Sequence, residues 1–167
     1  LIAFQLGSEV SYEELGKQLG MSKTTVEKYL DLLEKVFVIY RLGAYSRNLR
    51  KEVTKAGKWY FYDNGIRNAL INNFNLLSQR NDVGQLWEQY FISERIKSNA
   101  SNLQYPQYHF WRTYDGQEID LLEIDNYQNI KAWETKWKSD KAKIPTAFAK
   151  AYPEAEFTII NQNNYLD

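Results

Sequence analysis

Two runs of alternating polar and apolar residues flank a turn sequence in GQEIDLLEIDNYQNIKAWETKW, residues 116–137. This alternation predicts a β-hairpin, with one strand on either side of DNYQN. If the turn is centred on Tyr127, with an odd-length loop such as 126–128, Asp120 lies directly opposite Glu134. Like charges in facing positions of a sheet are destabilising, so we do not expect stability to favour this register. A divalent cation held between the two carboxylates would explain it.

The residues around this pair have the chemistry of a metal-dependent hydrolase. Glu134 and Lys136 share one face of their strand, while Thr135 sends its side chain to the other face and leaves its carbonyl between them. Asp120, Glu134 and the carbonyl of Thr135 are therefore the candidate ligands of Mg²⁺ or Mn²⁺. The metal can polarise a phosphodiester and activate a bound water, while Lys136 orients the nucleophile or neutralises developing negative charge. The pattern predicts metal-assisted phosphodiester hydrolysis.

Two other interpretations of these residues stay open. Asp120, Glu134 and Lys136 could lie on an exposed sheet face, where charges pair across strands and Lys136 bridges both acids. A nuclease-like fold could also serve, without catalysis, as a platform that binds nucleic acid or protein partners.

Composition argues against several other classes of protein. The 167 residues are 44% hydrophobic and 16% aromatic, which predicts one or two compact domains. There is no cysteine and a single histidine, His109, which argues against disulfides, a zinc site or a Ser-His-Asp triad. Lys plus Arg and Asp plus Glu both number 21, so no chain-wide field attracts nucleic acid or membrane. No membrane span or signal peptide is evident, and we expect a cytoplasmic protein.

The first half is expected to be a winged helix-turn-helix domain, residues 1–78. Ser11 followed by Glu14 is a capping-box signature for a helix over about residues 12–20. Gly20 suits a left-handed C-cap, and Ser22 suits the N-cap of the next helix. That second helix carries one apolar stripe, formed by Val26, Tyr29, Leu30, Leu33, Val36 and Phe37. Two β-like runs, VFVIYRLGAYSRN and KWYFYDNGI, then fit the two-stranded wing.

The wing region carries a strong local charge bias. Six basic residues and one acid, Glu52, lie between positions 41 and 58. Together with the second helix they predict contacts to nucleic-acid phosphates. The candidate phosphate-contacting residues are Lys23, Lys28, Arg41, Arg47, Arg50, Lys51, Lys55 and Lys58. The alternative is a helix-turn-helix that only packs, because Glu27, Asp31 and Glu34 give the second helix a face of mixed charge.

The second half, residues 79–167, is expected to be a small α/β domain with a mixed sheet. The polar run NNFNLLSQRND marks the boundary near residue 78, and VGQLWEQYFISERIKSN predicts a helix after it. The runs YHFWRT, EIDLLEI and IKAWETKW predict three antiparallel strands. IPTAFAKAYP then predicts a short helix, and EFTIIN predicts a last strand. The fold class is therefore α/β, or α+β.

With the helix LWEQY upstream, the strings EID and ETK resemble the PD-(D/E)XK, or restriction-endonuclease-like, superfamily. The resemblance implies that Glu88, from the helix, joins Asp120, Glu134 and Lys136 at the metal and catalytic positions. The proline that names the superfamily is absent, since Ile119 precedes Asp120.

More narrowly, the succession of winged helix, KWYFYDNGI, LWEQYFISE, FWRTYDGQEIDLL and ETKW is similar to the C-terminal region of prokaryotic predicted AAA+ ATPases. In that family a domain of unknown function (family 4143) follows the ATP-binding module. No G-x-x-x-x-G-K-[ST] occurs in this chain, so ATP is expected only in a missing N-terminal part. The opening LIAFQLGS, which looks like the tail of a helix, also predicts a fragment of a longer protein.

The sequence thus predicts divalent-metal-dependent cleavage or binding of nucleic acid, with DNA as the expected partner, within a larger ATPase. The competing prediction is a non-catalytic nuclease-like module that docks protein partners or neighbouring ATPase subunits.

Overall fold

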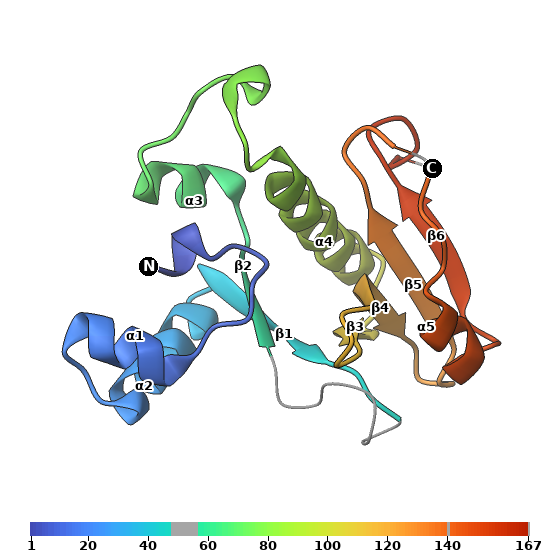
Figure 1. Ribbon diagram of the computed structural model, residues 1–167, viewed down its shortest axis with the longest axis horizontal. Coiled ribbons are helices and arrows are strands. Elements are labelled where there is room, and N and C mark those ends of the chain that lie inside the picture. Colours follow the sequence, from blue (N-terminus) through green and yellow to red (C-terminus); the bar gives the residue numbers. More distant parts are fainter. Residues whose placement is uncertain (48–56, 140, 167) are drawn as a thin grey trace.

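The computed structural model describes residues 1–47, 57–139 and 141–166, and in these residues six strands form one mixed sheet (Figure 1). The strand order is β2-β1-β3-β4-β5-β6, with parallel pairing of β1 with β3 and of β5 with β6 and antiparallel pairing elsewhere. The strands are β1 Ile39–Ala44, β2 Gly57–Phe61, β3 Gln107–Arg112, β4 Glu118–Ile124, β5 Ile130–Thr135 and β6 Glu156–Ile160. The predicted mixed α/β class is confirmed, and each run predicted as a strand overlaps one.

The described helices begin and end close to where the sequence signals lie. They are α1 Tyr12–Leu19, α2 Lys23–Lys35, α3 Asn64–Leu70, α4 Val83–Ser101 and α5 Thr146–Ala151, with short 3-10 turns at Ile2–Phe4 and Leu77–Gln79. The hydroxyl of Ser11 accepts a hydrogen bond from the backbone N–H of Glu14, and Ser22 accepts one from Thr25. Gly20 ends α1 with a φ of 67°, in the left-handed region. The predicted caps are confirmed.

The apolar stripe predicted on α2 is buried only in part. Val26 and Leu30 are 4% and 5% exposed, and they pack into the core. Tyr29, Val36 and Phe37 are each more than half exposed. The helical periodicity holds as far as Lys35, where α2 ends. Val36 and Phe37 lie beyond the helix, and the stripe overstated the face that the described chain covers.

The hairpin expected to form a wing belongs to the main sheet. β1 pairs with β2 and also, in parallel, with β3, where Gly43 lies opposite His109. The sheet therefore runs across residue 78, the expected domain boundary. Arg50, Lys51 and Lys55 of the predicted wing lie outside the described residues. The winged-helix identity and the division into two domains stay predictions.

Helices pack against both faces of the second half of the sheet (Figure 1). Successive residues of a strand point to opposite faces. Leu121 of β4 packs in one apolar cluster with Phe91 of α4, and the next residue, Leu122, packs in another with Phe148 of α5. All four side chains are at most 4% exposed. The long helix α4 is thus fixed over one face, and it brings its own polar residues to β4 and β5.

Candidate active site

The register between β4 and β5 is the one predicted from the turn. Leu121 lies opposite Trp133, and Ile124 lies opposite Ile130, which centres the turn on Tyr127. The carboxylate of Asp125 closes this turn, because it accepts hydrogen bonds from the backbone N–H groups of Tyr127 and Asn129 at 2.8 and 2.9 Å. The predicted turn and register are confirmed as far as Leu121 and Trp133, while the direct pairing of Asp120 with Glu134 stays a prediction.

A β-bulge in β4 sits at the candidate metal ligand. His109 of β3 pairs with Leu122 and Trp111 pairs with Ile119, so one residue of β3 faces both Asp120 and Leu121. Such a bulge inserts an extra residue, increases the local twist and turns side chains away from strict alternation. The side chain of Asp120 can therefore point away from the face of the sheet that strict alternation along β4 would give it.

Asp120 makes its hydrogen bonds to Thr135, at the end of β5. Its Oδ2 accepts bonds from the backbone N–H and from the hydroxyl of Thr135, both at 2.8 Å. The prediction that the side chain of Thr135 turns away from Asp120 is wrong, because the hydroxyl points at this carboxylate. Asp120 and the candidate ligand Thr135 are thus neighbours, through a contact that simple alternation did not predict.

Glu134 and Lys136 form an ion pair beside Asp120. The Lys136 ammonium lies 2.5 Å from Oε1 of Glu134, whose side chain is 15% exposed. Burial and the nearby charge of Asp120 raise the pKa of Glu134 above its ordinary value, and Lys136 opposes this rise. Burial lowers the pKa of Lys136, but the charges of Glu134 and Asp120 outweigh it, and that pKa is raised. The acids repel each other, and the lysine partly offsets the repulsion.

Glu88, in the N-terminal half of α4, points into the same cluster. Its Oε1 accepts a hydrogen bond from the hydroxyl of Tyr60 at 2.5 Å. Burial and the charge of Asp120 raise the pKa of Glu88 to about 7. By contrast Glu94, on the same helix, is half exposed and pairs with Lys97. Of the two candidate glutamates on α4, Glu88 is the one that lies with Asp120.

Lys58 of β2 occupies the centre of these acids. Its side chain is 6% exposed and forms ion pairs with Glu118 and, at 3.5 Å, with Glu88. Burial by itself lowers the pKa of Lys58, but the charges of Glu88 and Glu118 outweigh it and raise the pKa. The interior position of Lys58 differs from the surface position that phosphate contact requires. Alternation along KWYFY could have indicated this, since Lys58 and Tyr60 share a face of β2 and both reach Glu88.

The acids of this cluster can be compared with the needs of a divalent cation. In the part of the chain that the structure describes, no three His, Cys, Asp or Glu side chains are grouped so that they could hold a metal ion. Mg²⁺ commonly uses only one or two carboxylates and completes its shell with water and substrate oxygens. Asp120 and Glu134 offer that number of hard oxygen donors, and their mutual repulsion is what a cation would relieve. The donor set fits a two-carboxylate site.

The other predicted phosphate-contacting residues are spread over α2 and β1. Lys23 pairs with Glu13 at 2.8 Å, and Lys28 and Arg41 are exposed. Arg47 donates from Nε to the hydroxyl of Tyr45 at 3.0 Å. Their role in binding nucleic acid stays a prediction.

Comparison with known proteins supports part of the predicted resemblance. Residues 83–165 match the family described as "Domain of unknown function (DUF4143)", and residues 1–77 match "Domain of unknown function (DUF8612)". The first of these domains is typically found with AAA-type ATPases. The predicted resemblance to this family is thus supported over residues 83–165, while the association with an ATPase and the restriction-endonuclease-like identity stay predictions.

Three bacterial proteins are similar to part of the chain. Uncharacterized proteins of Mycobacterium tuberculosis and Mycobacterium bovis are each 29% identical over 123 residues, which is 72% of this chain and 27% of the relative. An uncharacterized protein of Haemophilus influenzae is 29% identical over 141 residues, which is 74% of this chain and 35% of the relative. The chain therefore spans only about a third of the length of these relatives, or less. No solved structure matches it significantly.

None of the described helices combines the length and the apolar character needed to cross a membrane.

Proposed function

We propose that this chain is the nucleic-acid-acting part of an ATPase-associated protein and hydrolyses phosphodiester bonds with a divalent cation. The observation that carries the proposal is that Glu88 of α4, Asp120 of β4, Glu134 of β5 and the adjacent Lys136 lie together, and the charge of Asp120 helps to raise the pKa of the other three. Perturbed acids that gather at one place are a common feature of active sites.

In this proposal Mg²⁺ or Mn²⁺ is held by Asp120 and Glu134, with the Thr135 carbonyl as the further candidate ligand. When bound, the cation would supply Lewis-acid activation of the phosphodiester and of a water. Asp120 is held in place by the two hydrogen bonds from Thr135. Lys136 lies beside Glu134, where its positive charge can stabilise charge that develops on a phosphate oxygen.

Glu88 suits the role of a proton carrier at this site. Its pKa of about 7 lies close to neutral pH, where a group can both accept and release a proton. Tyr60 fixes the carboxyl group through the hydrogen bond to Oε1. Nucleic acid is the proposed substrate class, and DNA is the first form to test.

A second candidate function is a non-catalytic module that docks protein partners or neighbouring ATPase subunits. The buried ammonium of Lys58 favours it, because this group already neutralises Glu88 and Glu118 without any added ion. Carboxylates that Lys58 already neutralises gain less free energy from binding a metal ion.

The test is cleavage of single- and double-stranded DNA by the purified chain in the presence of Mn²⁺. We expect Asp120→Asn and Lys136→Met to lower the rate at least about 100-fold, because each removes a charge that acts at the reacting phosphate. Glu94→Gln, an exposed change on α4, is the matched control and should leave the rate unchanged.

Equal rates in the wild type and in both site variants would mean that a contaminant cleaves the DNA, and the nuclease proposal would be rejected. Absence of cleavage by the wild type, together with no rise in melting temperature on adding Mn²⁺, would favour the docking module.

A further inference from the structure

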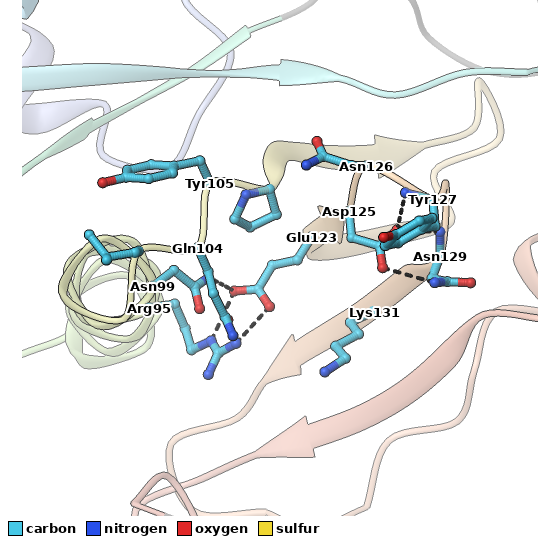
Figure 2. A pocket seen from close by; sticks show the side chains of 12 residues that line it. Arg95, Asn99, Gln104, Tyr105, Glu123, Asp125, Asn126, Tyr127, Asn129 and Lys131 are labelled. Atoms are coloured by element: carbon cyan, nitrogen blue, oxygen red, sulfur yellow. Dashed lines mark hydrogen bonds and ion pairs between the residues drawn. The ribbon is translucent and has the colours of Figure 1, made fainter.

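A cleft lies on the α4 side of the sheet, at the far end of β4 and β5 from the acid cluster. It has a volume of about 430 Å³ and is enclosed by the C-terminal half of α4, the chain leading into β3 and the turn between β4 and β5. Figure 2 shows side chains of these three segments: Arg95 and Asn99 point toward Glu123, and the ring of Tyr105 extends away from the turn that carries Tyr127. The volume is in the range of sites that hold one small molecule or one unit of a polymer.

The floor of this cleft is a rigid polar group. Glu123, whose side chain is 5% exposed, accepts hydrogen bonds from Nε and Nη2 of Arg95 at 2.9 and 2.7 Å (Figure 2). The amide of Asn99 donates to the same carboxylate and to the hydroxyl of Tyr108, both at 3.0 Å. The guanidinium of Arg95 also lies over the ring of Trp133, 4.7 Å from its centre. Bidentate pairing and stacking together fix the floor before any ligand arrives.

The walls offer amide groups and aromatic rings. Gln104 and Tyr105 lie on one side, and Asn126 and Tyr127 lie on the turn at the other side (Figure 2). The two tyrosines are 70% and 87% exposed, so packing of the fold makes little use of their rings. An amide side chain carries a donor beside an acceptor, as the edge of a nucleobase does, and a tyrosine ring can stack on the face of any base.

Two acids and two bases line the cleft, so its lining carries no net charge, and Lys131 is the group that can meet a negative ligand. Glu123 is neutralised by Arg95. The carboxylate of Asp125 is used within its own turn, where it accepts three hydrogen bonds. Lys131, which is exposed at the mouth, takes part in no ion pair within the described part of the chain. The charge of Lys131 helps to lower the pKa of Asp125, and no ion pair of the described residues holds its ammonium away from a phosphate, which a neutral sugar does not have.

We propose that this cleft binds one nucleotide of a single-stranded nucleic acid. The base lies against the tyrosine rings and the amides, and the phosphate lies near Lys131. This inference rests on the proposed function and extends it, because it assigns a strand form and a second contact to the same substrate.

The spacing of the two sites suits one continuous strand. On α4, Arg95 lies seven residues after Glu88, which is about 10 Å along a helix. On β4, Glu123 lies three residues after Asp120, again about 10 Å. Stacked nucleotides rise about 3.4 Å each, so the cleft and the acid cluster are about three nucleotides apart. A strand that reaches both sites must run over the outer surface, because Phe91 and Leu121 fill the space between α4 and the sheet.

The experiment compares binding of a single-stranded DNA 8-mer with that of an 8-mer of the same backbone that lacks its bases. Fluorescence anisotropy gives the dissociation constants, and NMR of the side-chain amides of Asn99, Gln104 and Asn126 reports the place of binding. We expect saturable shifts of these amides with the complete 8-mer and an affinity at least about 10-fold weaker for the base-free strand.

Tyr105→Ala should weaken binding of the complete 8-mer by about 10-fold and leave the base-free strand unaffected. The matched control is Tyr114→Ala, because Tyr114 is also 70% exposed but lies on the turn between β3 and β4, away from the cleft. Circular dichroism before titration checks that both variants are folded.

Equal affinity for the two strands, or wild-type affinity in Tyr105→Ala, would overturn the inference. So would amide shifts of the same size with a neutral glucose oligomer, which would mark the cleft as a sugar site. Asp120→Asn separates the two proposals: loss of cleavage with unchanged amide shifts supports both. If the wild type binds the 8-mer but does not cleave DNA, the nucleotide-binding proposal stands and only the nuclease proposal is rejected.

Discussion

The Lys58→Met variant is expected to unfold with a free energy about 3–5 kcal/mol lower than that of the wild type at pH 8. Methionine has nearly the length of lysine, so the change removes the charge and leaves most of the volume. The ammonium of Lys58 is almost fully buried between Glu88 and Glu118, and it lies 5.3 Å from the centre of the Phe110 ring. Without it, the buried carboxylate of Glu88 loses its ion-pair partner next to Asp120, and among the described residues Glu118 keeps only Arg112, 3.5 Å away, as a counter-charge.

Urea unfolding followed by circular dichroism measures this loss, and Lys35→Met is the matched control. Lys35 is 69% exposed and pairs with Asp31 on the surface of α2, so its replacement should cost less than about 1 kcal/mol. The cost of Lys58→Met should shrink at pH 5, because Glu88 takes up a proton there and no longer needs a partner. A loss below about 1 kcal/mol at pH 8 would show that water, and not Lys58, balances these acids.

The hairpin around the candidate site could be predicted because its determinants are local. Alternation placed the strands, and DNYQN placed the turn, which Asp125 closes through hydrogen bonds to residues only two and four positions away. The caps at Ser11, Gly20 and Ser22 are local in the same way. Glu88 could be named only through a resemblance, since nothing in its neighbourhood distinguishes it from Glu94.

The contacts that could not be predicted depend on segments distant in sequence. The parallel pairing of β1 with β3 joins residues more than sixty positions apart, and it carries Lys58 and Tyr60 to Glu88. Six basic residues in one stretch suggested a surface patch, because composition does not distinguish an exposed lysine from one that lies under a helix. The bulge at Asp120 likewise depends on pairing with β3, and so the contact with Thr135 was missed.

The same contacts join the two halves of the chain at the site. Lys58 and Tyr60 come from the segment that matches one family, and Glu88 comes from the segment that matches the other. A change in how β2 packs on α4 would alter the charge on Glu88 as well as the packing. The acid cluster and the first half of the chain are therefore coupled through one carboxyl group.

Glu88→Gln should remove the contribution of Glu88 to the fall in stability that the wild type shows as the pH rises from about 4.5 to about 7. The pKa of Glu88 is about 7 in the folded chain, compared with an ordinary value of 4.5. Between these values the folded state binds more protons than the unfolded state, so stability decreases with rising pH. Glutamine keeps the oxygen that accepts the Tyr60 hydrogen bond and has no proton to lose.

The difference between the two unfolding free energies should therefore be small near pH 4.5, grow through pH 6 and level off above pH 7, where the variant is more stable by about 3 kcal/mol. The raised pKa of Glu134 gives a slope of the same sign, but it acts in both proteins and cancels in the difference. Urea unfolding at half-unit steps of pH measures this difference in unfolding free energy. Glu94→Gln is the control, and its plot of stability against pH should parallel that of the wild type. A Glu88→Gln curve that also parallels the wild type would mean that Glu88 is already ionised at pH 5. Glu88 could then not act as a proton carrier near neutral pH, and strong repulsion among the carboxylates of the acid cluster would no longer be supported.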